Sequence, residues 1–154
     1  MLSNFCIVAF THQDLGKLVI PPEERSSKLT ALKAAFDVEE VFYIGTCNRV
    51  EIALVSREPL TEKIIHSLIK QLNSDLTPFQ GQEIAQAACF FHGFDALEHL
   101  IRVSCSLESM VVGEKEILSQ VRADFDSCFK SGLTGDVLRM IMNCVVKAAK
   151  EVYT

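Results

Sequence analysis

EEVFYIGTCNRVEIALV, residues 39–55, is the stretch that decides the fold and first points to a chemistry. Its apolar halves, residues 39–45 and 50–55, predict two strands joined by a very short antiparallel connection at Cys47 and Asn48. A cysteine at a turn is unusual, because free cysteine is normally a buried small hydrophobe. The neighbouring Arg49 favours the thiolate, which is the nucleophilic form. A structural cysteine that ends a strand fits the same pattern.

The segments around this hairpin predict a split arrangement of strands and helices. Apolar, β-branched runs predict further strands at residues 4–11 and 87–91, and helical spacing predicts helices at residues 23–36 and 61–72. Residues 73–86 are polar, contain Pro78 and are expected to form a loop. The order βαββαβ indicates an α+β, ferredoxin-like antiparallel sheet with both helices on one face. C-terminal helices are then expected at residues 95–105, 114–131 and 136–153.

Composition limits the classes of protein that this chain can represent. Its 154 residues are 49% apolar, which is enough for one domain with a full core. The net charge of −5 argues against a general nucleic-acid coat protein. Six scattered cysteines without a CxxC pattern indicate reduced cytosolic thiols, and the four histidines form no metal-ligand spacing with them. No apolar run is long enough for a membrane span, and because Met1 to Asn4 show no basic region before an apolar stretch, we expect no secretory signal.

A second segment with chemical potential is SCSLESMVVGEKEILSQVR, residues 104–122. It predicts a turn followed by a helix that begins with Glu114, Lys115 and Glu116. Acidic residues in a first turn suit the helix dipole, so capping and solvation explain them as well as a function does. Glu116 and Gln120 share one face at a spacing of four residues, and Glu114 lies outside the apolar stripe, where it could face a cleft.

Three motifs together resemble a known family. TCNRVE at residues 46–51, HLIRV at residues 99–103 and SLESMVVGEKEILSQVR at residues 106–122 are similar to the N-terminal catalytic domain of glutamyl-tRNA reductase. The resemblance covers essentially the whole chain. It implies reduction of glutamyl-tRNA with NADPH to glutamate-1-semialdehyde, the first step of tetrapyrrole (5-aminolevulinate) synthesis by the five-carbon route. It also implies a thioester intermediate on the cysteine of TCNR, which is Cys47 here.

The resemblance carries further roles onto matching positions of this chain. Thr46 and Asn48 would contact the glutamyl group, and Arg49 would pair with the substrate carboxylate through its planar fork of donors. His99 would act as an acid/base or as an orienting group. The remaining substrate-binding positions implied by the resemblance are Ser109, Glu114, Lys115, Glu116 and Gln120. Among these, Glu114 is suited to the substrate ammonium.

The chain also departs from the usual family pattern. The family usually reads GLDSM where residues 106–110 read SLESM, and GEPQI where residues 113–117 read GEKEI. Glu116 therefore adds a charge beside the expected site, which affects the assignment of contacts at Lys115 and Glu116. The usual N-terminal pattern survives only as Ala9 and His12, and no role is assigned to His12.

The sequence contains no glycine-rich strand-turn-helix fingerprint for a dinucleotide. The last predicted helix runs to residue 154 without a stop signal. We therefore expect residues 1–154 to be the catalytic domain of a longer protein, with the family's NADPH-binding and dimerisation domains outside it. This chain alone should not complete the reduction. The resemblance further implies a cytoplasmic, homodimeric full-length protein, a monomeric or weakly dimeric fragment, and glutamyl-tRNA and glutamate-1-semialdehyde aminomutase as partners.

Two alternatives to the reductase domain stay open on the sequence. One is a non-catalytic ferredoxin-like module that binds a small ligand or RNA, in which Cys47 is inert. The other is a cysteine acyl hydrolase that uses Cys47 with His99 as its base, which requires the two side chains to lie within hydrogen-bond reach. A hydrolase should accept simple esters, whereas the reductase domain should require glutamyl-tRNA.

Overall fold

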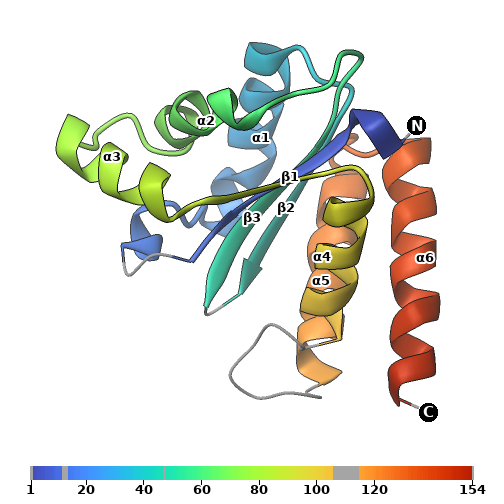
Figure 1. Cartoon of the computed structure of the whole chain (residues 1–154). Helices are drawn as coiled ribbons and strands as arrows, with labels where there is room; N and C mark the ends of the chain where they lie inside the picture. The colour runs from blue at the N-terminus through green and yellow to red at the C-terminus, as the bar shows by residue number, and fades with distance from the viewer. Residues whose placement is uncertain (1, 12–13, 47, 106–114, 154) are drawn as a thin grey trace.

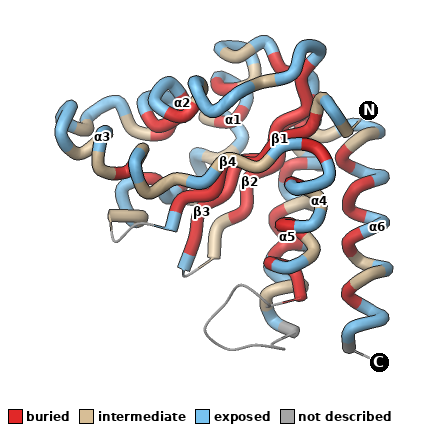
Figure 2. The backbone as a smooth tube through the Cα atoms, viewed as in Figure 1, coloured by how far each residue is buried: buried red, intermediate tan, exposed pale blue. Residues whose placement is uncertain are grey.

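The computed structural model describes residues 2–11, 14–46, 48–105 and 115–153. Its centre is a four-stranded, wholly antiparallel sheet with the strand order β2-β3-β1-β4 (Figure 1). The strands are β1 (Phe5–Phe10), β2 (Glu40–Thr46), β3 (Arg49–Val55) and β4 (Cys89–His92). The first three are almost continuous runs of buried residues, because helices cover both faces of the sheet (Figure 2).

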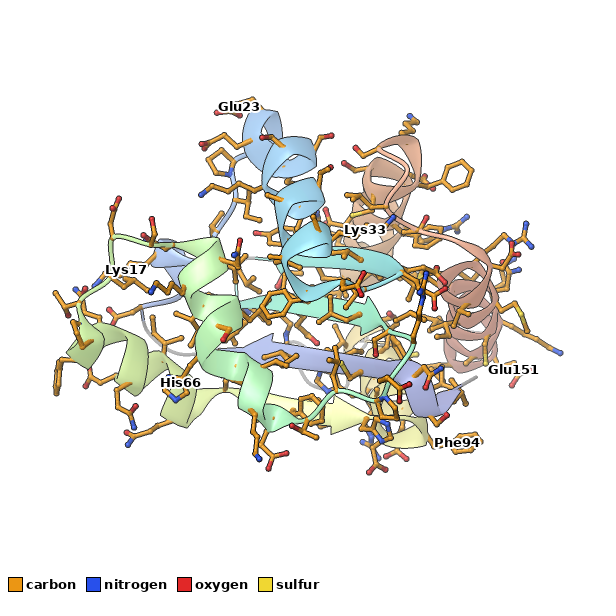
Figure 3. The ribbon with its side chains drawn as sticks, turned by 90° about the horizontal axis from the view of Figure 1, so that it is seen from above. Lys17, Glu23, Lys33, His66, Phe94 and Glu151 are labelled. Atoms are coloured by element: carbon orange, nitrogen blue, oxygen red, sulfur yellow. The ribbon has the colours of Figure 1, made fainter. Side chains whose placement is uncertain are left out.

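Helices α1 (Pro22–Phe36) and α2 (Ile65–Leu72) lie over one face of the sheet, as the view from above shows (Figure 3). Both contribute leucines to the core. Proline at the first position of α1 is favourable, since its missing N–H would have no helical partner there. The helix ends at Asp37, whose φ of 51° places it in the left-handed region. The prediction of two helices on one face is thereby confirmed for the segments that flank the hairpin.

The prediction that residues 73–86 form a loop is wrong. They contain a further helix, α3 (Pro78–Ala87), which packs beside α2. Thr77 and Gln80 form a reciprocal capping box at its start, and Pro78 occupies the first helical position. The proline therefore marks the start of a helix at this position.

The opposite face of the sheet is covered by α4 (Phe94–Ser104) and α5 (Lys115–Lys130), and α6 (Asp136–Tyr153) packs against α4 (Figure 1). The three C-terminal helices are confirmed. Phe125 of α5 meets Phe42 edge to face with ring centroids 5.5 Å apart, which seats α5 on the sheet. The buried Glu40 carboxylate accepts the backbone N–H groups of Gly135, Val137 and Leu138, and so caps α6 from the sheet.

Buried thiols make the stability of this core sensitive to alkali. Cys6 of β1 is 1% exposed, and its burial raises the pKa of the thiol from 9.0 to about 12. The unfolded chain therefore loses this proton at a pH at which the folded chain keeps it. The free energy of unfolding should fall as the pH rises from about 9 to about 12, by up to about 1.4 kcal/mol per pH unit for this group.

Urea unfolding at successive pH values measures this slope, and Cys6→Ala should reduce it. Cys144 is an exposed free cysteine, so Cys144→Ala is the matched control and should leave the slope unchanged. An identical alkaline slope in the parent chain and in Cys6→Ala would contradict the assignment.

Candidate active site

The β2–β3 hairpin presents the residues that flank Cys47 at one end of the sheet. Thr46 pairs with Arg49 across the two strands, and the backbone N–H of Asn48 donates to Oγ1 of Thr46 over 3.4 Å. Asn48 is exposed and Thr46 is half-buried. In Figure 1 the hairpin end and the facing ends of α4 and α5 lie on the same lower side of the molecule.

Arg49 and His99 are brought together by a residue that was not predicted, Glu51. The Glu51 side chain is 0% exposed. Its Oε2 accepts from Nη1 of Arg49 over 3.1 Å, and its Oε1 lies 2.6 Å from Nε2 of His99. Residues 49 and 51 point to the same face because strand side chains alternate, and His99 reaches them from α4 on that face. We call Arg49, Glu51 and His99 the carboxylate triad.

The triad is buried and held from several sides. Arg49 is 9% and His99 4% exposed, and the His99 ring stacks on Phe91 of β4 with centroids 4.0 Å apart. A buried carboxylate is stable only when it is paired and hydrogen-bonded, and Glu51 has both an ion pair and a hydrogen bond. Nδ1 of His99 has no hydrogen-bond partner within the described ranges. If the bond to Glu51 uses an Nε2–H, Nδ1 carries a lone pair in the neutral ring.

A second polar group lies along the outer edge of β2, where α5 runs. Asp124 of α5 is 2% exposed. Its Oδ2 accepts the backbone N–H of Gly45 over 2.9 Å, and its Oδ1 accepts from Arg25 of α1 over 3.1 Å and from Nε2 of Gln120 over 3.0 Å. The Arg25 guanidinium also lies 4.8 Å from the centroid of the Tyr43 ring. We call these five residues the Asp124 cluster.

Edge strands expose backbone donors, and α5 and the turn that follows it satisfy two of those of β2. Gly45 donates to Asp124, and Val41 donates to the carbonyl of Leu133 over 2.8 Å. Burial raises the pKa of the Cys128 thiol, and a backbone hydrogen bond from Tyr43 partly opposes this rise. Burial likewise raises the pKa of Asp124, against the lowering effects of Gly45, Arg25 and Gln120. The cluster therefore fixes α5 to the strand that leads into Cys47.

The remaining predicted site residues divide into two groups. Glu116 and Gln120 are exposed on the first turns of α5, and Lys115 is its first residue. Cys47, Ser109, Glu114 and also His12 lie outside the described residues, so their roles stay predictions. Glu51 lies within the quoted TCNRVE motif, and a carboxylate inside an otherwise apolar strand is a signal that could have singled it out. No such signal marks Asp124, because the sequence around it is typical of the solvent-exposed face of a helix.

The described residues offer neither a metal centre nor a membrane span. Among them, no three His, Cys, Asp or Glu side chains are grouped so as to hold a metal ion. No helix in the described ranges is long and apolar enough to cross a membrane. They also do not fit a dinucleotide, because the strands among them pair in antiparallel fashion and a single glycine, Gly93, joins β4 to α4.

Comparison with known proteins places the chain in a family. Residues 9–154 match the family model described as glutamyl-tRNA(Glu) reductase, N-terminal domain. The chain is 34% identical over 132 residues to the glutamyl-tRNA reductase of Syntrophus aciditrophicus, covering 86% of the chain and 31% of that protein. It is 32% identical over 152 residues to that of a Sulfurovum species, covering 95% and 34%.

A solved structure shares the fold. The glutamyl-tRNA reductase from Methanopyrus kandleri superposes with a TM-score of 0.75 at 24% identity, over 97% of this chain and 34% of that one. The chain thus spans about a third of the length of these relatives. On the match of residues 9–154, the chain belongs to the glutamyl-tRNA reductase N-terminal domain family.

Proposed function

We propose that this chain is the catalytic domain of an NADPH-dependent glutamyl-tRNA reductase, and that its own part of the reaction is to take the glutamyl group from tRNA onto Cys47. The observation that carries the proposal is the buried carboxylate triad directly beside the hairpin that bears Cys47. The family match and the relatives named glutamyl-tRNA reductase supply the substrate class. The strand order β2-β3-β1-β4 supports describing the domain as ferredoxin-like.

The proposed step is acyl transfer. The Cys47 thiolate attacks the ester carbonyl carbon, a C–S bond forms, and the C–O bond to the terminal ribose of the tRNA breaks. The ribose oxygen leaves with the bonding electron pair and takes up a proton. The product is a thioester, which accepts hydride more readily than a carboxylate would. Thr46, Asn48, Ser109, Glu114, Lys115, Glu116 and Gln120 are the proposed substrate contacts.

Within this proposal, the contacts of His99 support an orienting role. Its Nε2 is engaged by Glu51, and the side chain is stacked on Phe91 and nearly fully buried. Glu51 in turn holds Arg49 through its other carboxylate oxygen. His99 thereby sets the position of the guanidinium that is proposed to receive the substrate carboxylate and to favour the thiolate.

The reduction of the thioester is proposed for the full-length reductase and not for these 154 residues alone. NADPH, when bound, would supply the hydride, but the described residues do not fit a dinucleotide. We therefore expect the 154-residue chain to form the thioester without producing aldehyde. The wider proposal also includes a cytoplasmic location, a homodimeric full-length protein with a monomeric or weakly dimeric domain, and contact with glutamate-1-semialdehyde aminomutase.

Incubation with radiolabelled glutamyl-tRNA tests the proposal. The chain should acquire label that hydroxylamine releases, and adding NADPH should yield no glutamate-1-semialdehyde. Simple glutamyl esters, offered in parallel, should not be turned over. Rapid hydrolysis of such esters would favour the acyl hydrolase, and tRNA binding without any label would favour a non-catalytic module. NADPH-dependent aldehyde from this chain would overturn the assignment of reduction to another domain.

A further inference from the structure

The Asp124 cluster does more than close the edge of the sheet, because it restricts the side chain of Gln120. Asp124 receives three donors: the Gly45 N–H, the Arg25 guanidinium and the Gln120 amide. Gln120 lies one helical turn before Asp124, on the same face of α5. Since Asp124 is 2% exposed and its hydrogen bonds reach a helix, a strand and its own helix, the carboxylate is held in place.

A carboxylate accepts hydrogen bonds and donates none. It therefore selects the NH₂ end of the Gln120 amide, and the opposite atom, Oε1, is directed away from Asp124. No hydrogen bond to Oε1 occurs among the described residues, and the Gln120 side chain is exposed. Gly45, which shares the same carboxylate, is two residues before Cys47 in the chain. The structure thus presents a fixed acceptor beside the hairpin that bears Cys47.

We propose that Asp124 is a positioning residue that fixes Gln120 so that its Oε1 accepts a hydrogen bond from the ammonium group of the glutamyl moiety. This proposal rests on the proposed function. It adds the residue that lets the site bind a glutamyl group with a free ammonium in preference to one whose nitrogen is acetylated. Arg25 balances the charge of Asp124 over 3.1 Å, so the buried carboxylate can stay ionised and keep its acceptor-only character.

Asp124→Asn separates this role from a structural one. The asparagine oxygen can still accept the Gly45 N–H, but its NH₂ group then faces both Gln120 and Arg25, and the ion pair with Arg25 is lost. The Gln120 amide must turn, and it presents donors to the substrate ammonium. We expect the half-saturating concentration of glutamyl-tRNA to rise about tenfold while the maximal rate of acylation is kept. The preference for glutamyl-tRNA over N-acetylglutamyl-tRNA should fall by a similar factor.

The matched control is the same substitution in a Gln120→Ala background. If Asp124 acts through Gln120, adding Asp124→Asn there should not change the preference between the two substrates any further. A merely structural role predicts an equal loss for both substrates, and the same loss with or without Gln120. Either of these two results would overturn the proposal.

A binding measurement tests the proposal even if the chain forms no thioester. 3′-Glutamylamino-3′-deoxyadenosine mimics the aminoacyl end of tRNA and cannot release its glutamyl group. Its addition should shift the NMR signals of the Gln120 side-chain amide, and its N-acetyl derivative should not. Absence of label with this shift present would refute the thioester step alone. Absence of the shift, or equal shifts from both compounds, would refute the role of Asp124.

Discussion

Replacing Glu51 with glutamine is expected to slow transfer of the glutamyl group about 100-fold. Glutamine keeps the size of the side chain but removes the charge that pairs with Arg49 over 3.1 Å. It also replaces one of the two acceptor oxygens with a donor, so both contacts are kept only if His99 moves its proton to Nδ1 and Nε2 accepts from the glutamine NH₂ group. A guanidinium displaced by even about 1 Å from its productive position can cost about 100-fold in rate.

The same substitution should also destabilise the fold. Breaking a buried ion pair by neutralising one partner leaves the other charge buried and unpaired, which typically costs about 3 kcal/mol or more. Urea unfolding measures this loss, and acylation is compared below the temperature at which the variant begins to unfold.

Glu39→Gln is the matched control for Glu51→Gln. Glu39 also faces an arginine, Arg57, but at 3.9 Å and with both side chains largely exposed. Exposed pairs of this kind contribute little to stability. The control should therefore acylate and unfold like the parent chain. An acylation rate in Glu51→Gln equal to that of Glu39→Gln would show that the carboxylate triad is not part of the site.

The strands and most helices could be predicted because local patterns specify them. The runs around residues 5–10 and 40–55 are apolar and β-branched, and the sheet was expected from them. The loop prediction for residues 73–86 rests on Pro78 as a loop signal, but Thr77 and Gln80 form a capping box that starts helix α3 around this proline. That error lies in the interpretation of local signals, which were present in the sequence.

The site was only partly predictable for a different reason. Arg49 and His99 were singled out, but the residue that joins them, Glu51, was not. Glu51 and His99 are 48 positions apart, and their contact exists only because α4 packs on the face of the sheet to which residue 51 points. Asp124 is a similar case, since its burial depends on α5 lying along the edge of β2. Such docking is not encoded in any local pattern.

Cys47→Ser is expected to abolish the labile acyl adduct entirely. A serine hydroxyl is not ionised near neutral pH and needs an adjacent base to become a nucleophile, whereas Nε2 of His99 is already engaged by Glu51. The substitution replaces one sulfur atom with oxygen and should leave the free energy of unfolding nearly unchanged. Loss of label in a well-folded variant would then report on chemistry alone.

The other cysteines provide an internal comparison. Cys89 and Cys144 are exposed free thiols, so an activated ester can reach them. Cys6, Cys105 and Cys128 are buried, and burial raises the pKa of each thiol. Nonspecific acylation by an activated ester would favour the two exposed cysteines, whereas a specific binding site would direct acylation to Cys47.

The most direct test is to locate the glutamyl adduct by peptide mass mapping after incubation with glutamyl-tRNA and an acid quench. We predict one hydroxylamine-sensitive glutamyl group on the peptide that contains Cys47, none on those that contain Cys89 or Cys144, and none anywhere in Cys47→Ser. An adduct distributed over the exposed cysteines, or one that persists in Cys47→Ser, would contradict the assignment of Cys47 as the nucleophile.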